Sequence, residues 1–328
     1  MINIKTVAQR AGVSPTTASC ALNNRPGVKQ DTIQKVLQAA KELNYTPNSL
    51  AQSFRSGKSN TIAVVTRENL DDNSIFSLEL MGIITEARAL NYDVLVKSVS
   101  NDSDLFPEQI GKLVESKKVD GVIFLGNGFE NQIEQMVSKN LKMVLLSSHS
   151  KHDVNVVNVD GEEWIYKITE YLIKRGLYKI AYVTFALETM EELNRERGFK
   201  KALVNYGLSC KDSVIESGYD SRGIFEVINK LVSNNRPQAI VCWNDTIALQ
   251  VINVLREIGL KVPGDIAVTG FDDILQDMYY TPHLTTIKQP FTEKGKCAMN
   301  LLVDLIELKL KGPVKKFVGC ELMVRESV

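Results

Sequence analysis

Short apolar runs recur along the chain from Thr61 onward, and the intervals between them have the length and apolar spacing of helices. A first series occupies 61–65, 92–96, 121–125 and 143–146, and a second occupies 179–183, 238–243 and 265–270. Strands that alternate with helices are typical of α/β domains with parallel sheets and crossover helices. Two consecutive series therefore predict two similar lobes, with a ligand cleft at the carboxyl ends of their strands.

The first 24 residues have a different pattern, in which a sharp break separates two short helices. Val7, Ala8 and Ala11 share one face of the first helix, and Gly12 supplies the positive φ that a tight turn between helices needs. Ser14 is suited to cap a second helix, and Pro15 to occupy its first position. The pattern predicts a helix-turn-helix whose second helix enters the major groove of DNA. The short side chains that this helix exposes would be Thr16, Thr17, Ser19, Cys20 and Asn23.

Charge distinguishes this N-terminal segment from an ordinary pair of surface helices. Residues 1–60 hold eight Lys and Arg against two acids, a net charge of +6, whereas the whole chain of 328 residues is neutral. The remaining residues therefore have a net charge of −6. Neutralisation of DNA phosphates explains such a basic segment better than solubility does.

A third helix over 30–43 would complete a bundle of about 45 residues, a size that is marginal when alone. The next segment, 48–58, places Leu50, Ala51 and Phe54 on one side, but it is too short for a stable isolated helix. It is either a plain linker or a helix that DNA, a sister chain or both must support.

Composition argues against several other classes of protein. No run of eighteen apolar residues occurs, and Met1 is not followed by a charged and then apolar leader, so we expect neither membrane insertion nor secretion. The five scattered cysteines, without a CxxC pair, are typical of reduced thiols in a cytoplasmic protein. GxGxxG, GxxxxGK, GxSxG and HExxH motifs are missing. His149 and His152 lack a third ligand nearby in sequence, which favours a surface loop over a zinc site. We therefore expect no catalysis and no cofactor.

Several blocks along the whole chain carry a resemblance to a known family. They include IKTVAQRAGVS (4–14), ELNYTPN (42–48), VDGVIF (119–124), Arg195 with Gly198 and Phe199, WND (243–245), GLKVPGDIAVTGFDD (259–273) and PHLTTIKQP (282–290). The sequence resembles the lactose/galactose-repressor family of bacterial transcription regulators. The resemblance implies a DNA-binding headpiece (1–47), a hinge helix and linker (48–60), and a core like periplasmic sugar-binding proteins (61–328).

In such a core the chain crosses three times between the lobes. The first lobe would then hold 61–160 and 290–320, and the second 161–289 and 321–328. The resemblance further implies a homodimer, at least, that binds a palindromic double-stranded operator with one headpiece on each half-site.

The resemblance also names the DNA-contacting positions. It places base readers at Pro15, Thr16 and Cys20, and a thiol cannot bind guanine bidentately as the arginine of many relatives does. We therefore expect a different operator base there, or readout by neighbours and DNA shape. Ser14, Thr17, Ser19 and Asn23 remain suited to phosphate or base-edge contacts. In the hinge, Phe54 stands where many relatives insert a leucine into the minor groove, with Ala51 on the same face. Packing of Phe54 against the core or a partner chain is the alternative.

For a small-molecule effector, the resemblance implies a site between the lobes. Its residues would be Phe76, Ser147, Phe185, Arg195, Asp245 and Asp272. Arginine and aspartate bind hydroxyl groups, and aromatic rings stack on sugars. Ser147 stands where many relatives carry Asp, and Phe185 faces the cleft only in one strand register. The competing interpretations are loop or helix capping for Asp245 and Asp272, and an ion pair with Glu192 for Arg195.

The function implied is a repressor of a carbohydrate-utilisation operon, controlled by a small effector. A neutral saccharide is favoured over a sugar phosphate, which would need more cation than Arg195 alone. The alternative is an activator or dual regulator, or one that answers to a nucleobase or phosphocarrier-protein co-repressor.

Overall fold

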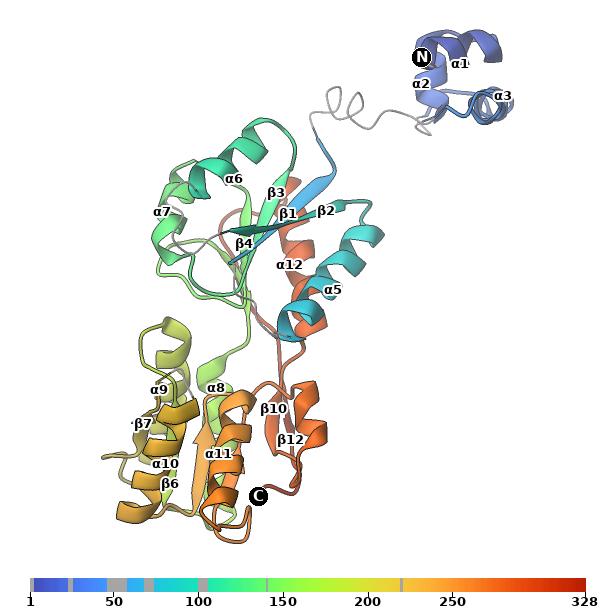
Figure 1. Ribbon diagram of the computed structural model, residues 1–328. Helices are drawn as coiled ribbons and strands as arrows, with labels where there is room; N and C mark the ends of the chain where they lie inside the picture. Colours follow the sequence, from blue (N-terminus) through green and yellow to red (C-terminus); the bar gives the residue numbers. More distant parts are fainter. Residues whose placement is uncertain are drawn as a thin grey trace. The chain divides into compact units, whose positions relative to one another are not determined.

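The computed structural model describes residues 3–22, 26–45, 58–67, 74–99, 106–139, 141–218 and 221–328. The chain divides into two compact units, Met1–Asn60 and Thr61–Val328, which are described separately (Figure 1).

The N-terminal unit contains α1 (Ile4–Ala11), α2 (Pro15–Leu22) and α3 (Gln30–Glu42). Gly12 ends α1 in the left-handed conformation at φ 67°, and the Ser14 hydroxyl accepts a hydrogen bond from the backbone N–H of Thr17 at 3.0 Å. The turn and the cap that the sequence predicts are therefore confirmed. Small buried side chains, among them Ala8, Ala18 and Ala40, let the three helices pack closely.

The second unit begins with a six-stranded parallel sheet in the order β11-β5-β4-β3-β1-β2. Its strands are β1 (Thr61–Arg67), β2 (Asp93–Val99), β3 (Gly121–Leu125), β4 (Met143–Leu146), β5 (Asn155–Asn158) and β11 (Lys315–Phe317). Helices α5 (Ser74–Ala89) and α12 (Phe291–Ile306) cover one face, and α6 (Phe106–Glu115) and α7 (Glu130–Ser138) cover the other. Alternate residues of β1 supply the two cores, Ile62 and Val64 to the first, Ala63 and Val65 to the second. We call this assembly lobe 1.

A four-stranded parallel sheet in the order β7-β6-β8-β9 forms lobe 2. Its strands are β6 (Ile180–Thr184), β7 (Val214–Glu216), β8 (Ala239–Cys242) and β9 (Ala267–Thr269). Helices α8 (Gly161–Lys174) and α9 (Met190–Asn205) pack on one face, and α10 (Ser221–Asn235) and α11 (Asp245–Glu257) on the other. A 3₁₀ helix, η1 (Leu275–Tyr279), and an antiparallel pair, β10 (Thr286–Lys288) with β12 (Glu321–Met323), complete it.

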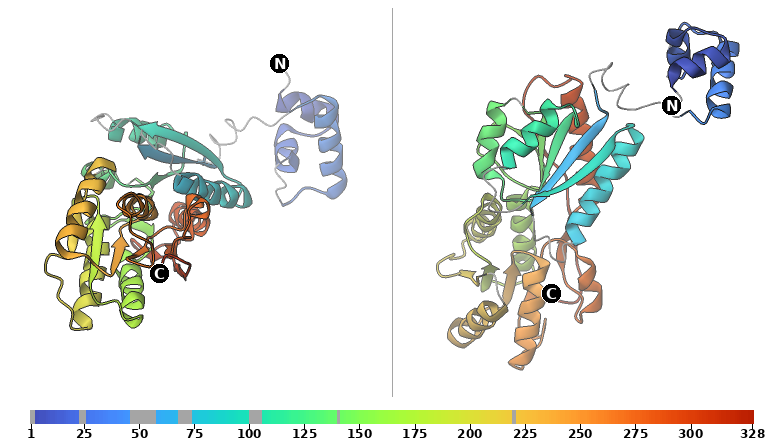
Figure 2. Two further views of the ribbon diagram at one scale, coloured as in Figure 1. Left: turned by 60° about the horizontal axis from the view of Figure 1, so that its bottom comes forward. Right: turned by 45° about the horizontal axis from the view of Figure 1, so that its top comes forward.

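The chain passes between the lobes three times, between β5 and α8, between β10 and α12, and between β11 and β12 (Figure 2). The α/β fold class, with parallel sheets in two lobes, is confirmed, and the helices and strands predicted between Thr61 and 270 are present. The short strands β5, β7 and β10 to β12 and the helix α12 were not among the predicted elements. Within the described part of the chain, no helix is both long and apolar enough to span a bilayer.

Candidate functional site

The start of α2 presents the residues predicted to contact DNA. Ser14, Pro15 and Thr16 are exposed, whereas Thr17, Ser19 and Cys20 are half-buried. This end of the helix is accessible, but the three later residues also pack against the bundle. Asn23, Ala51 and Phe54 lie outside the described residues, so their predicted DNA contacts stay predictions.

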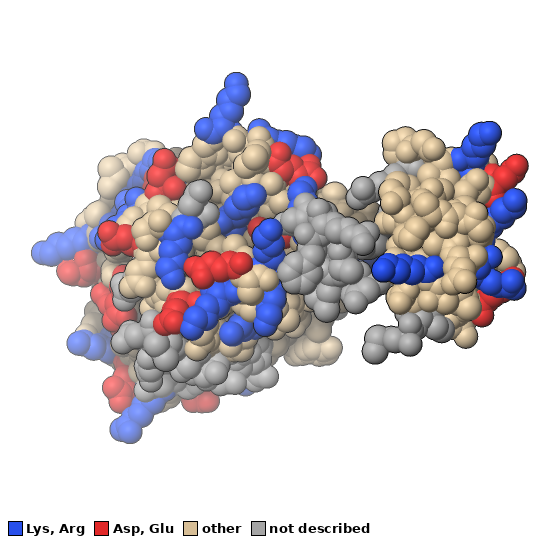
Figure 3. Space-filling view, turned by 90° about the horizontal axis from the view of Figure 1, so that it is seen from above, with Lys and Arg blue, Asp and Glu red and all other residues tan. Residues whose placement is uncertain are grey.

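Figure 3 shows acidic and basic side chains mixed over the visible face of the core. The sequence carries a net charge of +6 over residues 1–60 and −6 over the rest of the chain, so the excess of basic residues lies in the N-terminal unit. A basic unit attached to a core of mixed surface charge is typical of a separate nucleic-acid-binding module.

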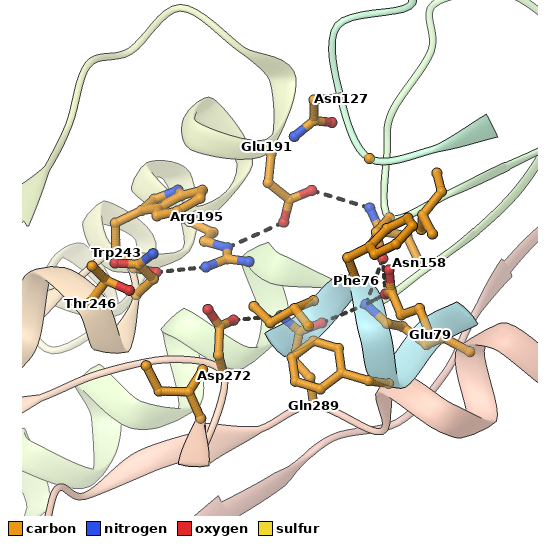
Figure 4. Close-up of a pocket in the computed structure, with 18 of the residues that line it drawn as sticks. Phe76, Glu79, Asn127, Asn158, Glu191, Arg195, Trp243, Thr246, Asp272 and Gln289 are labelled. Carbon is orange, nitrogen blue, oxygen red and sulfur yellow. Dashed lines mark hydrogen bonds and ion pairs between the residues drawn. The ribbon is translucent and has the colours of Figure 1, made fainter. Parts of the chain in front are cut away.

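Between the lobes lies a cavity of about 650 Å³, large enough for a small organic molecule. Phe76, Ser147, Arg195 and Asp272 line it, as the resemblance implied (Figure 4). Lobe 1 contributes Phe76 from α5 and Ser147 after β4, and lobe 2 contributes Arg195 from α9 and Asp272 after β9. The cavity therefore joins side chains as far apart in the sequence as Phe76 and Asp272, which are 196 positions apart.

Arg195 is held from three sides in a buried position. Its Nε donates to Oε1 of Glu191 at 3.2 Å, and its Nη1 donates to the carbonyl oxygen of Trp243 at 2.6 Å. The guanidinium carbon lies 4.4 Å from the ring centre of Trp243 and 3.9 Å from that of Phe271. The expected alternative partner, Glu192, instead completes a capping box with Thr189 at the start of α9. The pairing with Glu192 is therefore wrong, and Glu191 is the partner.

Glu191 connects the two lobes. From the lobe 1 side, Nε2 of His149 lies 2.6 Å from its Oε2, and the Asn158 amide donates to the same oxygen at 3.1 Å. Burial by itself raises the pKa of a carboxyl, but the hydrogen bond from His149 and the charge of Arg195 outweigh it and lower the pKa of Glu191 to about 2. Glu191 is therefore ionised at neutral pH. The interpretation of His149 as part of a surface loop is wrong, because its ring is largely buried against α9.

Asp272 faces the cavity from below Arg195 in the view of Figure 4. Its backbone has φ 129°, a value that few residues other than glycine adopt, and its Oδ1 accepts a hydrogen bond from Gln289 at 2.7 Å. Burial raises the pKa of Asp272 to about 7, although the charge of Arg195 opposes the rise. This carboxyl can therefore donate or accept a hydrogen bond near neutral pH.

A second buried ion pair lies on the lobe 1 wall. Lys294 of α12 donates to Glu79 of α5 at 2.8 Å, to the Ser147 hydroxyl at 2.7 Å and to Gln289 at 2.8 Å. The ammonium group thus uses all three of its hydrogens within the protein. Through Gln289 this cluster continues to Asp272, so polar contacts extend from lobe 1 to lobe 2 along the cavity wall.

Two of the expected effector residues lie outside the cavity lining. Asp245 is fully buried, and its carboxylate accepts hydrogen bonds from the Thr286 hydroxyl at 2.5 Å and from the backbone N–H groups of Asp273 and Ile274 at 2.6 and 3.1 Å. It therefore orders the loop after β9, which is the capping role given as the alternative. The ring centre of Phe185 lies 5.6 Å from that of Trp243, which lines the cavity, whereas Phe185 itself does not.

The cavity includes residues that sequence reasoning missed. Glu79 lies within a helix that was predicted from its apolar residues, whereas Lys294 and Asn158 lie in elements, α12 and β5, that were not predicted. Glu191 lies one helical turn before Arg195, and this spacing was the one signal that could have identified it. Trp243 belonged to a recognised block, but its role as a platform under Arg195 depends on the fold.

Comparisons with known proteins agree with this architecture. Residues 3–48 match the model for bacterial regulatory proteins of the lacI family, and residues 169–328 match the model for a periplasmic binding protein-like domain. The HTH-type transcriptional repressor PurR of Vibrio vulnificus is 30% identical over 100% of this chain and 99% of its own. Catabolite control protein A of Priestia megaterium is 33% identical over 92% of this chain and 91% of its own.

Solved structures show the same relationship. The lac repressor dimer bound to operator and the anti-inducer ONPF has a TM-score of 0.82 and 26% identity, covering 99% of this chain and 98% of that one.

Proposed function

This chain belongs to the lacI family of bacterial regulatory proteins and is a DNA-binding transcription regulator, and we propose that it represses a carbohydrate-utilisation operon under the control of a neutral saccharide. The saccharide binds in the cavity between the lobes, and the regulator acts as a cytoplasmic homodimer on a palindromic operator. It is a regulator rather than an enzyme.

The charge balance of the cavity carries the proposal for the effector. Among the described residues, the charged groups that line it are three cations, Arg67, Arg195 and Lys294, and three carboxyls, Glu79, Glu191 and Asp272. Arg195 and Lys294 are each already paired with a carboxylate. A ligand with a strong negative charge would therefore compete with carboxylates that two of the three cations already bind.

The other lining groups suit a molecule with several hydroxyls. The amides of Asn127 and Gln289, the carboxyl of Asp272 and the guanidinium of Arg195 supply donors and acceptors on both walls (Figure 4). The rings of Phe76 and Trp243 add flat apolar surface on opposite lobes. Polar groups beside aromatic faces match the two kinds of surface that a sugar ring presents.

The mechanism follows from a ligand site that both lobes build. A saccharide that contacts Arg195 in lobe 2 and Phe76 in lobe 1 favours one angle between the lobes over another. We propose that this angle sets the spacing of the two hinge segments in the dimer, and with it the order of the hinge helices on DNA. A 100-fold change in operator affinity needs a ligand that discriminates the two states by about 2.7 kcal/mol.

A thermal-shift screen read beside operator binding tests the proposal. Neutral saccharides, sugar phosphates and purines are added to the purified full chain, and binding to an operator selected from random palindromic DNA is measured with each. We expect a neutral saccharide to raise the melting temperature and to release the DNA. Stabilisation by a purine together with tighter operator binding would replace the proposal with a co-repressor mechanism. If no compound changes the melting temperature or operator binding, control by a protein partner is favoured.

A further inference from the structure

We propose that Glu191 determines the charge of the effector, because it occupies Arg195 and so admits uncharged sugars while rejecting carboxylates and phosphates. The inference rests on the proposed function and assigns the selectivity of that cavity to one residue. Sequence reasoning gave Glu191 no role, whereas the structure places it at the cavity wall beside Arg195 (Figure 4).

The first step concerns the hydrogens of Arg195. A carboxylate or phosphate binds arginine most strongly through two parallel hydrogen bonds to one edge of the guanidinium. The edge formed by Nε and Nη2 is closed, because the single hydrogen of Nε points to Oε1 of Glu191 at 3.2 Å. One hydrogen of Nη1 is also used, by the carbonyl oxygen of Trp243 at 2.6 Å. Three hydrogens remain, one on Nη1 and two on Nη2, and each can donate to a single hydroxyl group of a sugar.

The second step is that Glu191 stays charged and in place. His149 and Asn158 approach its Oε2 from lobe 1 at 2.6 and 3.1 Å, while Arg195 holds Oε1 from lobe 2. The side chain is about 7% exposed, so it has no room to turn into solvent when an anion arrives. An anionic ligand at Arg195 would therefore lie beside a fixed negative charge in a poorly solvated site, where like charges repel strongly.

The third step is that the other cations of the cavity do not compensate. Lys294 directs its three hydrogens to Glu79, Ser147 and Gln289. Arg67, on lobe 1, donates to Gln132 and to the carbonyl oxygen of Gly128, and lies over the rings of Phe106 and Phe129. Arg195 is the cavity cation of lobe 2, and Glu191 is the carboxylate that an anion would have to displace from it.

The test uses matched pairs of sugars that differ in charge. Glucose is compared with glucuronate and with glucose 6-phosphate, and galactose with galacturonate, by thermal shift and then by titration calorimetry on the full chain. We expect the wild-type protein to bind the neutral sugar of a pair and not its acidic or phosphorylated counterparts. Glu191→Gln keeps the shape of the side chain and one acceptor oxygen for Arg195, but it removes the charge and the acceptor that faces His149 and Asn158. It should improve the affinity for the matching acid by about tenfold or more relative to the neutral sugar.

Two further variants make the result specific. Glu188→Gln removes the same charge from an exposed side chain that precedes α9 and lies outside the cavity lining, and it should leave the selectivity unchanged. The double variant Glu191→Gln/Arg195→Gln should lose the acid response again, because the charge of Arg195 is what attracts the acid once the carboxylate beside it is gone. If Glu191→Gln does not fold, the affinities of the wild-type protein test the inference. Equal affinity for the acid and for the neutral sugar would overturn it.

The outcomes separate this inference from the function on which it rests. A neutral response in the wild type without any gain of acid binding in Glu191→Gln refutes the inference and leaves the proposed effector class standing. A gain of acid binding in Glu191→Gln beside a silent wild type supports the inference and removes the tested neutral saccharides as effectors. If neither the wild type nor any variant binds a tested sugar, the result counts against both the inference and the proposed function.

Discussion

The Nε atom of Arg195 lies 3.2 Å from Oε1 of Glu191, one helical turn earlier in α9, and both side chains are more than nine-tenths buried. The arginine that the resemblance gives to the effector is therefore also half of a buried ion pair. Removing one partner from such a pair leaves an uncompensated charge in the interior, which typically destabilises a protein by about 3–5 kcal/mol. Effector recognition and core stability thus depend on the same contact.

Arg195→Ala is expected to abolish the effector response while operator binding remains. The effector loses its lobe 2 donor, and among the described residues Glu191 keeps His149 and Asn158 as partners. The measurement is operator affinity with and without the saccharide, together with a melting curve that should show a lower transition temperature. Arg197→Ala is the control and should respond normally. Arg197 lies on the same helix as Arg195, but it is exposed and pairs with Glu162 of α8. A normal response of Arg195→Ala would place the effector elsewhere.

Asp272 predicts a pH dependence of stability. Its pKa is about 7 in the folded chain and 3.8 as the reference value, so between these values the folded state binds a proton that the unfolded state does not. Stability should therefore fall as the pH rises through this window. Asp272→Asn stays neutral, so denaturant titrations at about pH 5 and about pH 8 should show a smaller loss than in the wild type. Asp153→Asn, at an exposed position, should keep the wild-type slope. An identical slope in Asp272→Asn would contradict the assignment.

Gly295 allows α12 to touch α5 backbone to backbone. A Cβ at this position would lie 2.1 Å from the carbonyl oxygen of Glu79 and 2.9 Å from the backbone nitrogen of Ile83. Because backbone atoms cannot move aside as side chains do, Gly295→Ala should lower the free energy of unfolding by about 3 kcal/mol or more. Gly312→Ala, where no atom lies within 4 Å of the added carbon, should change it little. Equal stability of the two variants in urea titrations would show that the helices separate freely.

Phe54→Ala is expected to weaken specific operator binding while the core dimer stays intact. The reason is the wedge role implied for the hinge, in which an apolar side chain enters a minor-groove step and kinks the DNA. Operator affinity is measured by gel shift or anisotropy, and the oligomeric state by sedimentation at the same concentration. Unchanged affinity would remove the wedge role, and loss of the dimer would instead indicate packing against the core or the partner chain.

The order of local elements and the family were readable from the sequence, because both depend on patterns that neighbouring residues carry. Apolar spacing predicted the helices and the central strands, and Gly12 with Ser14 predicted the turn and cap of the helix-turn-helix. Short strands such as β5 and β11 were missed, since three or four residues give too weak a periodic signal and their pairing depends on distant partners.

The residues of the cavity show more clearly what could not be predicted from the sequence. Resemblance identified Arg195 and Asp272 but also selected Asp245, whose carboxylate the fold uses to order a loop. The competing interpretation paired Arg195 with Glu192, although that carboxylate belongs to the capping box at Thr189 and Glu191 is the partner of the arginine. The approach of His149 to Glu191 joins residues of different lobes, and only the packing of those lobes brings the two side chains to 2.6 Å.

Sequence by itself thus determined the alternating helices and central strands of the two lobes and the kind of regulator they build, because those depend on local spacing and on motifs kept in order. Tertiary structure alone decided which charges meet in the cavity. That outcome depends on burial and on contacts between lobes, and a pattern along one chain does not contain the distances that govern either.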